Sequence, residues 1–308
     1  MKLFPTTLNV HGDHIHPLAH IVTDRLCEIC PDSFKKVDSI AESEVVITNA
    51  PSAPPYDFDK KLADKIDKPI VIFNDADGYM PDCDEKGFGE LVRTSYNIKL
   101  YFYREWWKGY GNPFSFQMVP FDIVTDHPKY ERQTLEGFCN RSLDVFWSQS
   151  IHTLSRKELW EHRSKLPTSL VNDKYRHCFS AKSLFDLQNE ARITIALEGG
   201  GIKCQSHCEA CVNSVMVMPD LEMVEPYPWI DGENCIRLPY KFGGEGSWLK
   251  PEGRGIIDIE GSLLKLRENL VNPNKLYAIY CAGIANAENY RLPNYYRNHV
   301  AESILKYV

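Results

Sequence analysis

The sequence predicts an α/β protein of two domains, each built on a parallel sheet. Its 308 residues suit two domains at roughly 150 residues each. Short runs of β-branched and apolar residues alternate with amphipathic segments in both halves, and this strand–helix rhythm is typical of parallel sheets. A polar, turn-rich stretch at residues 125–141 interrupts the rhythm. We therefore expect domains at residues 1–135 and 136–308.

The first half contains short apolar runs bounded by turn-forming residues, which predict strands. The predicted strands are residues 3–10, 45–48, 69–73, 99–103 and 119–124. Two segments carry their apolar residues on one helical face. These predicted helices are residues 17–29 and 57–66.

The second half repeats the alternation. Strands are expected at residues 143–147, 192–197, 215–218 and 235–238, and helices at residues 155–166, 180–191, 203–212, 261–270, 275–287 and 294–308. We expect Ser155 to cap its helix, because Glu158 stands three residues later in the capping-box position.

Composition excludes several classes of function. The formal net charge is −7 and no block of lysine or arginine stands out, which argues against a nucleic acid partner. The start of the chain does not read as a signal peptide, and no segment approaches the length of a membrane span. A cytoplasmic location is expected, with most of the ten cysteines reduced.

The most informative segment is a predicted strand–turn–helix–strand unit at residues 191–219. Gly199, Gly200 and Gly201 separate the strand from the helix, and glycines allow a sharp turn and close approach of the backbone to a ligand. The helix N-terminus that follows favours an anion, so the unit is suited to a phosphate or diphosphate. The alternative is a tight turn without a ligand, since neither GxxxxGK[ST] nor GxGxxG is present.

Charged residues accompany this unit. Arg156 and Lys203 stand at predicted helix starts, where both could neutralise a diphosphate, and arginine is the better bidentate partner. Glu209, in the same predicted helix as Lys203, could accept hydrogen bonds from ribose hydroxyls. Solvated surface charges are the alternative interpretation of all three.

Two groups in the first half could carry chemistry. Asp75 and Asp77 follow an apolar strand, where they could hold a divalent cation, act as a general base or cap a turn. His14 and His16 follow the first strand. One of them could be a general base, or the HxH pair could begin a metal site of the amidohydrolase kind. The second possibility gives an alternative function, a metal-dependent hydrolase.

The succession of segments in the second half resembles a known family. It comprises DVFWSQS followed by Arg156, then RITIALEGGG, then the helix with Cys208-Glu209-Ala210, and then NSVMVMP. This order resembles the donor-binding domain of two-domain (GT-B) nucleotide-sugar glycosyltransferases, most of all the exostosin-type and fucosyltransferase-type groups. The resemblance covers residues 143–290. In the first half it rests on VVITNAPS, KPIVIFND and LYFYRE.

The resemblance implies two Rossmann-like domains facing across a cleft, with residues 294–308 packed back on the first domain. It implies transfer of a sugar from a nucleotide diphosphate donor, a UDP- or GDP-sugar, to a glycan or other hydroxyl acceptor. The residues implied to bind the donor are Arg156, Gly199, Gly200, Gly201, Lys203 and Glu209.

On the acceptor side the resemblance implies a base among Asp75, Asp77, His14 and Glu105, of which an aspartate is favoured. It also implies that Arg104 and Glu105 contact the acceptor. It implies no bound metal or other cofactor, because cations and helix dipoles stabilise the leaving diphosphate. Many retaining relatives carry a second glutamate eight residues after the first, where Val217 stands here, so inversion is expected. A non-catalytic sugar- or nucleotide-binding module is a third interpretation.

Overall fold

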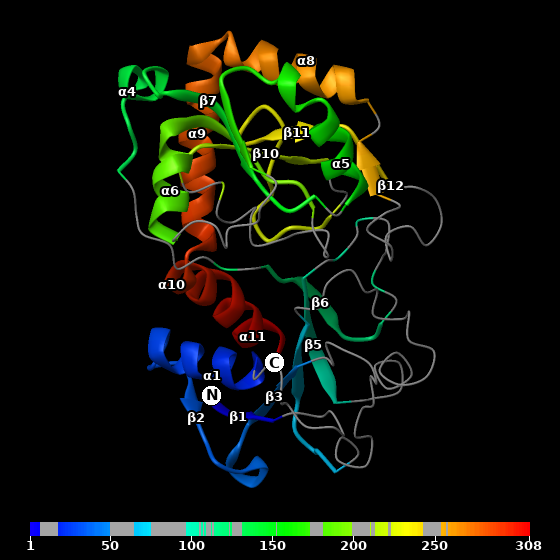
Figure 1. The fold of residues 1–308 in the computed structure, drawn as a ribbon. Coiled ribbons are helices and arrows are strands. Elements are labelled where there is room, and N and C mark those ends of the chain that lie inside the picture. Colours follow the sequence, from blue (N-terminus) through cyan, green and yellow to red (C-terminus); the bar gives the residue numbers. More distant parts are fainter. Residues whose placement is uncertain are drawn as a thin grey trace. The chain divides into compact units, whose positions relative to one another are not determined.

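The computed structural model divides the chain into two compact units (Figure 1). Unit 1 consists of Met1–Ile123, Glu222–Pro226 and Leu292–Val308, and unit 2 of Val124–Leu221 and Tyr227–Arg291. The structure describes residues 1–6, 18–49, 65–74, 97–104, 106, 108, 112, 114–122, 124, 131–151, 153–172, 181–198, 210, 213–220, 223–242, 254–256 and 258–308.

Within these residues, unit 1 contains a six-stranded sheet in the order β2-β1-β3-β4-β5-β6. All its neighbouring strands are parallel. Every residue of β3 and β4 is buried, as expected for central strands of a parallel sheet. The strands are β1 (Lys2–Pro5), β2 (Lys35–Lys36), β3 (Val45–Asn49), β4 (Ile70–Asn74), β5 (Ile98–Tyr103) and β6 (Gln117–Pro120).

Helices from both ends of the chain pack in unit 1. α1 (Leu18–Ile29) buries one stripe of residues and packs against β1, β3 and a π-helical turn at Tyr296–Ala301. That turn lies between α10 (Leu292–Tyr295) and α11 (Glu302–Tyr307), and Figure 1 shows α11 beside α1. A short 3-10 helix at Ile40–Glu42 precedes β3.

The described part of unit 2 contains a five-stranded parallel sheet in the order β11-β10-β9-β7-β8. Its strands are β7 (Leu143–Ser148), β8 (Ser169–Asn172), β9 (Ala191–Ile195), β10 (Val215–Pro219) and β11 (Ile236–Leu238). A separate antiparallel pair is formed by β12 (Tyr240–Phe242) and β13 (Arg254–Ile256).

The helices of unit 2 pack with this sheet in two hydrophobic clusters, the smaller of which contains Phe146, Ala191 and Leu184 of α6. Residues such as Trp147, Ile195 and Val217 from the strands pack with Leu266 and Ile279 from the helices. The helices are α4 (Leu135–Cys139), α5 (Leu154–Glu161), α6 (Ala181–Glu190), α8 (Ile259–Leu270) and α9 (Pro273–Ala287), with 3-10 turns at Arg163–Lys165 and Glu288–Tyr290.

Hydrogen bonds explain two wrong predictions. The strand expected at residues 119–124 ends at Pro120, because the Asp122 amide donates to the Tyr295 hydroxyl at 2.8 Å instead of continuing the ladder. Ser155 does not cap α5. The helix starts one residue earlier, with Thr153 at the N-cap position, and the Ser155 hydroxyl donates to Glu198.

The parallel sheets and most other predicted elements are confirmed. Four features were not predicted, and all of them are short: β2, β8, the β12–β13 pair and α4. The predicted helices at residues 57–66 and 203–212 lie almost entirely outside the described residues.

Candidate functional site

The carboxyl ends of β7 and β9 carry a group of buried polar side chains in unit 2. The connection after β7 leads to β8 on one side of the sheet, whereas the chain after β9 leads to β10 and β11 on the other. Such a change of direction opens a crevice at the carboxyl ends of open α/β sheets, where ligands bind. Five side chains gather here with 2% exposure or less, and we call them the switch-point cluster: Gln149, Thr153, Ser155, Arg156 and Glu198.

Gln149 binds the main chain of Leu197. Its Nε2 donates to the Leu197 carbonyl at 2.9 Å, and the Leu197 amide donates to its Oε1 at 2.8 Å. The indole Nε1 of Trp147 donates to the same Oε1 at 3.1 Å. The Gln149 side chain is therefore fixed at both its oxygen and its nitrogen.

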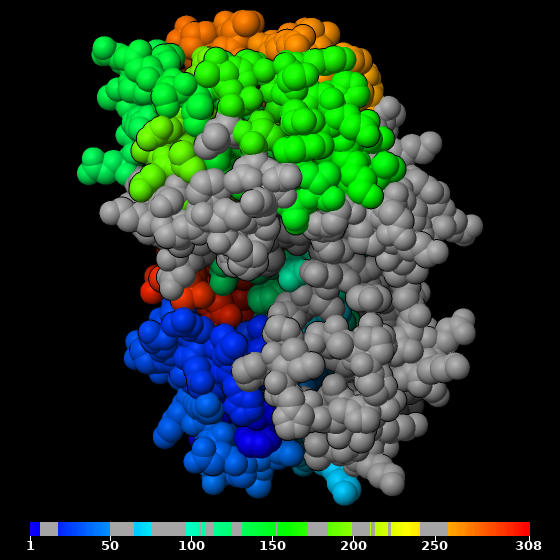
Figure 2. Space-filling model, in the orientation of Figure 1, coloured from blue at the N-terminus to red at the C-terminus, as the bar shows by residue number. Residues whose placement is uncertain are grey.

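Arg156 joins the chain leaving β7 to the chain leaving β9. Its Nη1 donates to the Ser150 carbonyl at 2.9 Å, and its Nη2 donates to the Leu197 carbonyl at 3.0 Å. Figure 2 shows green atoms of the segment around α5 at the surface of unit 2, whereas the inward side chains of α5, including Arg156, are buried. A positive charge is thus buried at the carboxyl ends of β7 and β9.

Ser155 and Thr153 form a directed chain of hydrogen bonds to Glu198. The Ser155 hydroxyl donates to a carboxylate oxygen of Glu198, and the oxygens of Thr153 and Ser155 are 3.2 Å apart. Since Ser155 has one hydroxyl proton, Thr153 is the donor to Ser155. This arrangement fixes the side chain that immediately precedes Gly199 in the sequence.

Among the residues predicted to bind the sugar donor, the structure describes Arg156 alone, and it lies in the switch-point cluster. Gln149, Ser155 and Glu198 were not predicted. A sequence signal existed, because Gln149 and Glu198 are polar residues directly after apolar strands. The other predicted donor residues lie outside the described residues: Gly199, Gly200, Gly201, Lys203 and Glu209.

Unit 1 carries its own buried polar residues at the carboxyl edge of its sheet. Asn74 ends β4, Arg104 follows β5 and Asp122 follows β6, and all three are buried. The Arg104 amide donates to the Asn74 carbonyl at 3.1 Å, while the Asn74 side chain donates to the Tyr101 hydroxyl at 2.8 Å. Arg104 was predicted, whereas Asp122 was missed because it was assigned to a strand.

The remaining predicted residues of the first half lie outside the described residues: His14, His16, Asp75, Asp77 and Glu105. Among the residues that are described, no three histidine, cysteine or acidic side chains gather as a potential metal site. None of the described helices is long and apolar enough to cross a membrane.

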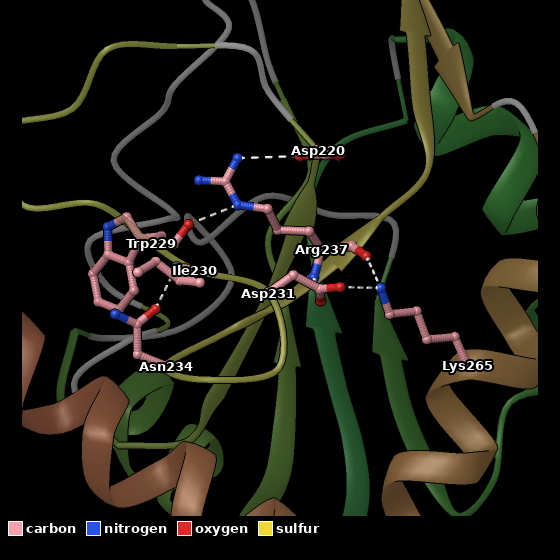
Figure 3. A network of polar contacts seen from close by, with 7 residues as sticks. All are labelled: Asp220, Trp229, Ile230, Asp231, Asn234, Arg237 and Lys265. Carbon is pink, nitrogen blue, oxygen red and sulfur yellow. Dashed lines mark hydrogen bonds and ion pairs between the residues drawn. The ribbon is translucent and has the colours of Figure 1, made fainter.

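A second polar network in unit 2 surrounds Arg237 on β11 (Figure 3). Its guanidinium donates to the Trp229 carbonyl at 2.8 Å and lies 3.3 Å from the Asp220 carboxylate. Asp231 accepts from the Arg237 amide at 2.8 Å and from Lys265 at 2.6 Å. Because Asp220 follows β10 and Lys265 lies on α8, the network ties the end of β10 and α8 to β11.

The chain matches no protein-family profile and no curated protein sequence. It is similar to solved structures. The GtfA/B complex gives a TM-score of 0.53 at 10% identity, over 85% of this chain and 56% of that one. An α,α-trehalose-phosphate synthase (UDP-forming) from Burkholderia xenovorans, in complex with glucose-6-phosphate, gives 0.50 at 9% identity, over 92% and 76%. The N-terminal domain of Candida albicans trehalose-6-phosphate phosphatase gives 0.57 at 7% identity, over 100% and 97%.

The chain spans little more than half the length of the GtfA/B chain that it matches. Identities of 10% or less make this a likeness of fold. The likeness extends over both units, since it covers 85% or more of this chain in each comparison. With its two units and their parallel sheets, the chain has the GT-B fold, which consists of two Rossmann-like domains.

Proposed function

We propose that this chain is a glycosyltransferase that moves a sugar from a nucleoside diphosphate donor to a hydroxyl group of a glycan or other acceptor. The observation that carries the proposal is the switch-point cluster. It holds a buried arginine at the ligand-binding edge of the sheet, and its last residue, Glu198, is followed by three glycines. Glycine-rich turns at this place in α/β sheets bind phosphate groups.

The donor is proposed to be a UDP- or GDP-sugar. Gly199, Gly200, Gly201 and Lys203 would bind its diphosphate, and Glu209 a ribose or sugar hydroxyl. The similar synthase from Burkholderia xenovorans is described as UDP-forming, which supports a uridine nucleotide. Direct contact of Arg156 with the diphosphate is part of the proposal, and its hydrogen bonds to Ser150 and Leu197 support a further role in holding the crevice.

Unit 1 is proposed to supply the acceptor side. An aspartate, Asp75 or Asp77, would deprotonate the acceptor hydroxyl, with His14 as the other candidate. Arg104 and Glu105 would contact the acceptor. Transfer would invert the anomeric centre and need no metal, because Lys203, Arg156 and a helix N-terminus would stabilise the leaving diphosphate.

Nucleotide binding tests the proposal first. Purified protein is titrated with UDP, GDP and ADP in the presence of EDTA, and thermal stability is measured in parallel. A ligand at a hundredfold excess over its dissociation constant stabilises the folded state by about 2.7 kcal/mol, so binding of one diphosphate is expected to raise the melting temperature. Absence of binding to every nucleotide with and without Mg²⁺ or Mn²⁺ would remove the donor site from the proposal.

Turnover is the second measurement. The protein is incubated with the sugar forms of the nucleotide that binds and with a panel of sugar acceptors, and nucleotide release is followed. Asp75→Asn and Asp77→Asn are compared with Asp67→Asn, an aspartate in the loop before β4. Loss of turnover in one of the first two variants, with nucleotide affinity retained, is expected for the base.

One comparison favours a second candidate function. The Candida albicans structure covers all of this chain with a TM-score of 0.57, and its name identifies it as the N-terminal domain of a phosphatase. The same fold thus occurs in a protein that is named for an activity other than sugar transfer, and we keep a non-catalytic module that binds a sugar or a nucleotide as the alternative. It predicts that the protein binds a nucleotide but turns over no donor with any acceptor. Asp75→Asn and Asp77→Asn should then leave nucleotide affinity unchanged.

A further inference from the structure

We propose that Gln149 is a positioning residue of the donor site, where its side-chain amide takes the place of the main-chain N–H and C=O of a neighbouring strand and fixes the chain that leads to the glycine segment. This inference rests on the proposed function, because it assumes that the segment following Glu198 binds the diphosphate. It assigns the role to Gln149, whose side chain acts through Leu197.

The strand register carries the first step. Val145 pairs with Ile193 and Phe146 with Thr194, and the same separation of 48 residues relates Gln149 to Leu197. The main chain of β7 ends at Ser148, before this pair is reached. The Gln149 amide donates to the Leu197 carbonyl and accepts from the Leu197 amide, as the N–H and C=O of two successive peptide groups would do in a parallel ladder.

The main chain after Ser148 continues to α5, while the chain after β9 keeps hydrogen bonds to neighbouring segments at Ala196 and Leu197. A side chain must both donate and accept to make the two bonds to Leu197, and among side chains of this length glutamine has the required amide. Glutamate lacks the donor when ionised, and asparagine is one methylene shorter.

Each residue before the glycines is held by a separate group. The Ala196 amide donates to the Val217 carbonyl at 2.8 Å. The Leu197 carbonyl accepts from both Gln149 and Arg156, which uses both of its lone pairs. The Glu198 carboxylate accepts from Ser155. Hydrogen bonds therefore fix the conformation of residues 196–198, which directly precede the glycines.

Fixing the residues before a glycine segment should affect ligand binding more than fixing those before other residues. Glycine loses more conformational entropy on ordering than any other residue, and this loss opposes ligand binding. Anchoring the residues before the glycines is expected to reduce the entropy that is lost when an anion binds. Gln149 is thus expected to affect nucleotide affinity and the KM for the donor more than kcat.

The test compares Gln149→Leu with a matched variant, Thr194→Val. Thr194 is on β9, and its buried hydroxyl is 2.5 Å from that of Ser214, so both variants remove buried hydrogen bonds made to β9 or to the residues directly after it. We expect Gln149→Leu to raise the dissociation constant for the bound nucleoside diphosphate about tenfold through lost preorganisation, and to accelerate amide exchange at Leu197. Thr194→Val should leave nucleotide affinity unchanged.

Gln149→Glu provides a second variant in case the leucine variant does not fold. An ionised glutamate cannot donate to the Leu197 carbonyl, whereas a protonated one can. Nucleotide affinity relative to the wild type should therefore recover as the pH is lowered. Equal loss of affinity in Gln149→Leu and Thr194→Val would overturn the inference, because the effect would then follow general destabilisation.

Failure of the inference and failure of the proposed function give different results. If the wild type binds nucleotide, and Gln149→Leu speeds Leu197 exchange without changing affinity, the inference is wrong and the function stands. If the wild type binds no nucleoside diphosphate, the proposed function fails and the donor-site role of Gln149 fails with it. Faster Leu197 exchange in Gln149→Leu would then establish a structural contact only.

Discussion

The Nη2 atom of Arg156 donates a hydrogen bond to the carbonyl oxygen of Leu197, 3.0 Å away. Because Arg156 also donates to Ser150, one guanidinium joins the chain segments that leave β7 and β9. The two printed acceptors, Ser150 and Leu197, are neutral carbonyl oxygens, so these two contacts do not neutralise the positive charge of the guanidinium. The same residue can therefore stabilise the fold and attract an anion.

Replacement of Arg156 tests both effects. We expect Arg156→Ala to lower the free energy of unfolding by about 2–4 kcal/mol, since hydrogen bonds from a buried charged group are lost. Nucleotide affinity should fall as well. Urea denaturation and calorimetric titration measure the two effects. Arg163→Ala, which removes an exposed arginine stacked on Trp160, is the control and should leave nucleotide affinity unchanged.

Lys203→Ala separates anion binding from stability. The proposed function places Lys203 at the diphosphate, so its removal should weaken nucleotide binding several-fold through loss of one charge-assisted contact, with little change in unfolding. Lys275→Ala, at an exposed position on α9, is the matched control. Equal nucleotide affinity in Lys203→Ala and the wild type would exclude this lysine from the site.

Ser155 and Glu198 should show energetic coupling. Ser155→Ala leaves the buried Glu198 carboxylate without its hydroxyl donor, which is expected to cost about 1–3 kcal/mol. In a Glu198→Gln background the same change should cost less, because a neutral amide needs the donor less. A double-mutant cycle by denaturant unfolding measures the difference, and strict additivity would contradict the contact.

This pair also shows where sequence reasoning reached its limit. The spacing of Ser155 and Glu158 fits a capping box, yet the hydroxyl binds a residue 43 positions away. Spacing in the sequence predicts only local contacts such as helix caps. A more favourable hydrogen bond to a residue distant in the sequence can replace them. The pairing of Gln149 with Leu197 was beyond prediction for the same reason, since it depends on strand register.

More of the fold than of the candidate site could be predicted from the sequence. Buried strands such as β4 and β10 are continuous apolar runs, and alternation of such runs with helices specifies parallel sheets. A strand of four residues such as β8 is too short to show a hydrophobic periodicity, so it was not predicted. Arg156 was predicted because its place between a predicted strand and a predicted helix can be seen in the sequence. Asp122 was not, because its role depends on where β6 ends.

Arg141 provides a contrasting case at the other end of the unit 2 sheet. Its guanidinium lies 4.8 Å from the ring centre of Phe138 and 4.9 Å from that of Tyr280, and it donates to Gln133 at 2.9 Å and to the Ala191 carbonyl at 2.6 Å. Burial lowers the pKa of Arg141 to about 10, so it is charged at neutral pH.

Arg141→Lys keeps the charge but loses the planar fork that makes both the stacking and the two hydrogen bonds. We expect a loss of about 1–3 kcal/mol in unfolding free energy. Nucleotide affinity should stay the same, because Ala191 begins β9 and the proposed site lies at its other end. A large loss of nucleotide affinity in this variant would contradict the location of the site.

His299 predicts how the stability of unit 1 depends on pH. It lies in the π-helical turn, with Nε2 2.6 Å from the Pro120 carbonyl and its ring packed against Phe102 and Tyr295. Burial is the main influence and lowers the pKa of His299, although the hydrogen bond to Pro120 and the charge of Glu302 act in the opposite direction.

Proton binding to His299 in the folded and unfolded states determines whether stability rises or falls with pH. A histidine whose pKa is lower in the folded state binds fewer protons than the unfolded chain does as the pH falls below about 6.5, its ordinary value. Its contribution to stability is therefore complete above that pH and is lost as the pH falls toward the folded-state pKa. His299→Gln should flatten this part of the curve of unfolding free energy against pH, whereas His20→Gln, at an exposed position on α1, should not. Chemical denaturation of the three proteins at several pH values provides the comparison, and parallel curves for wild type and His299→Gln would show that the buried ring does not control acid stability.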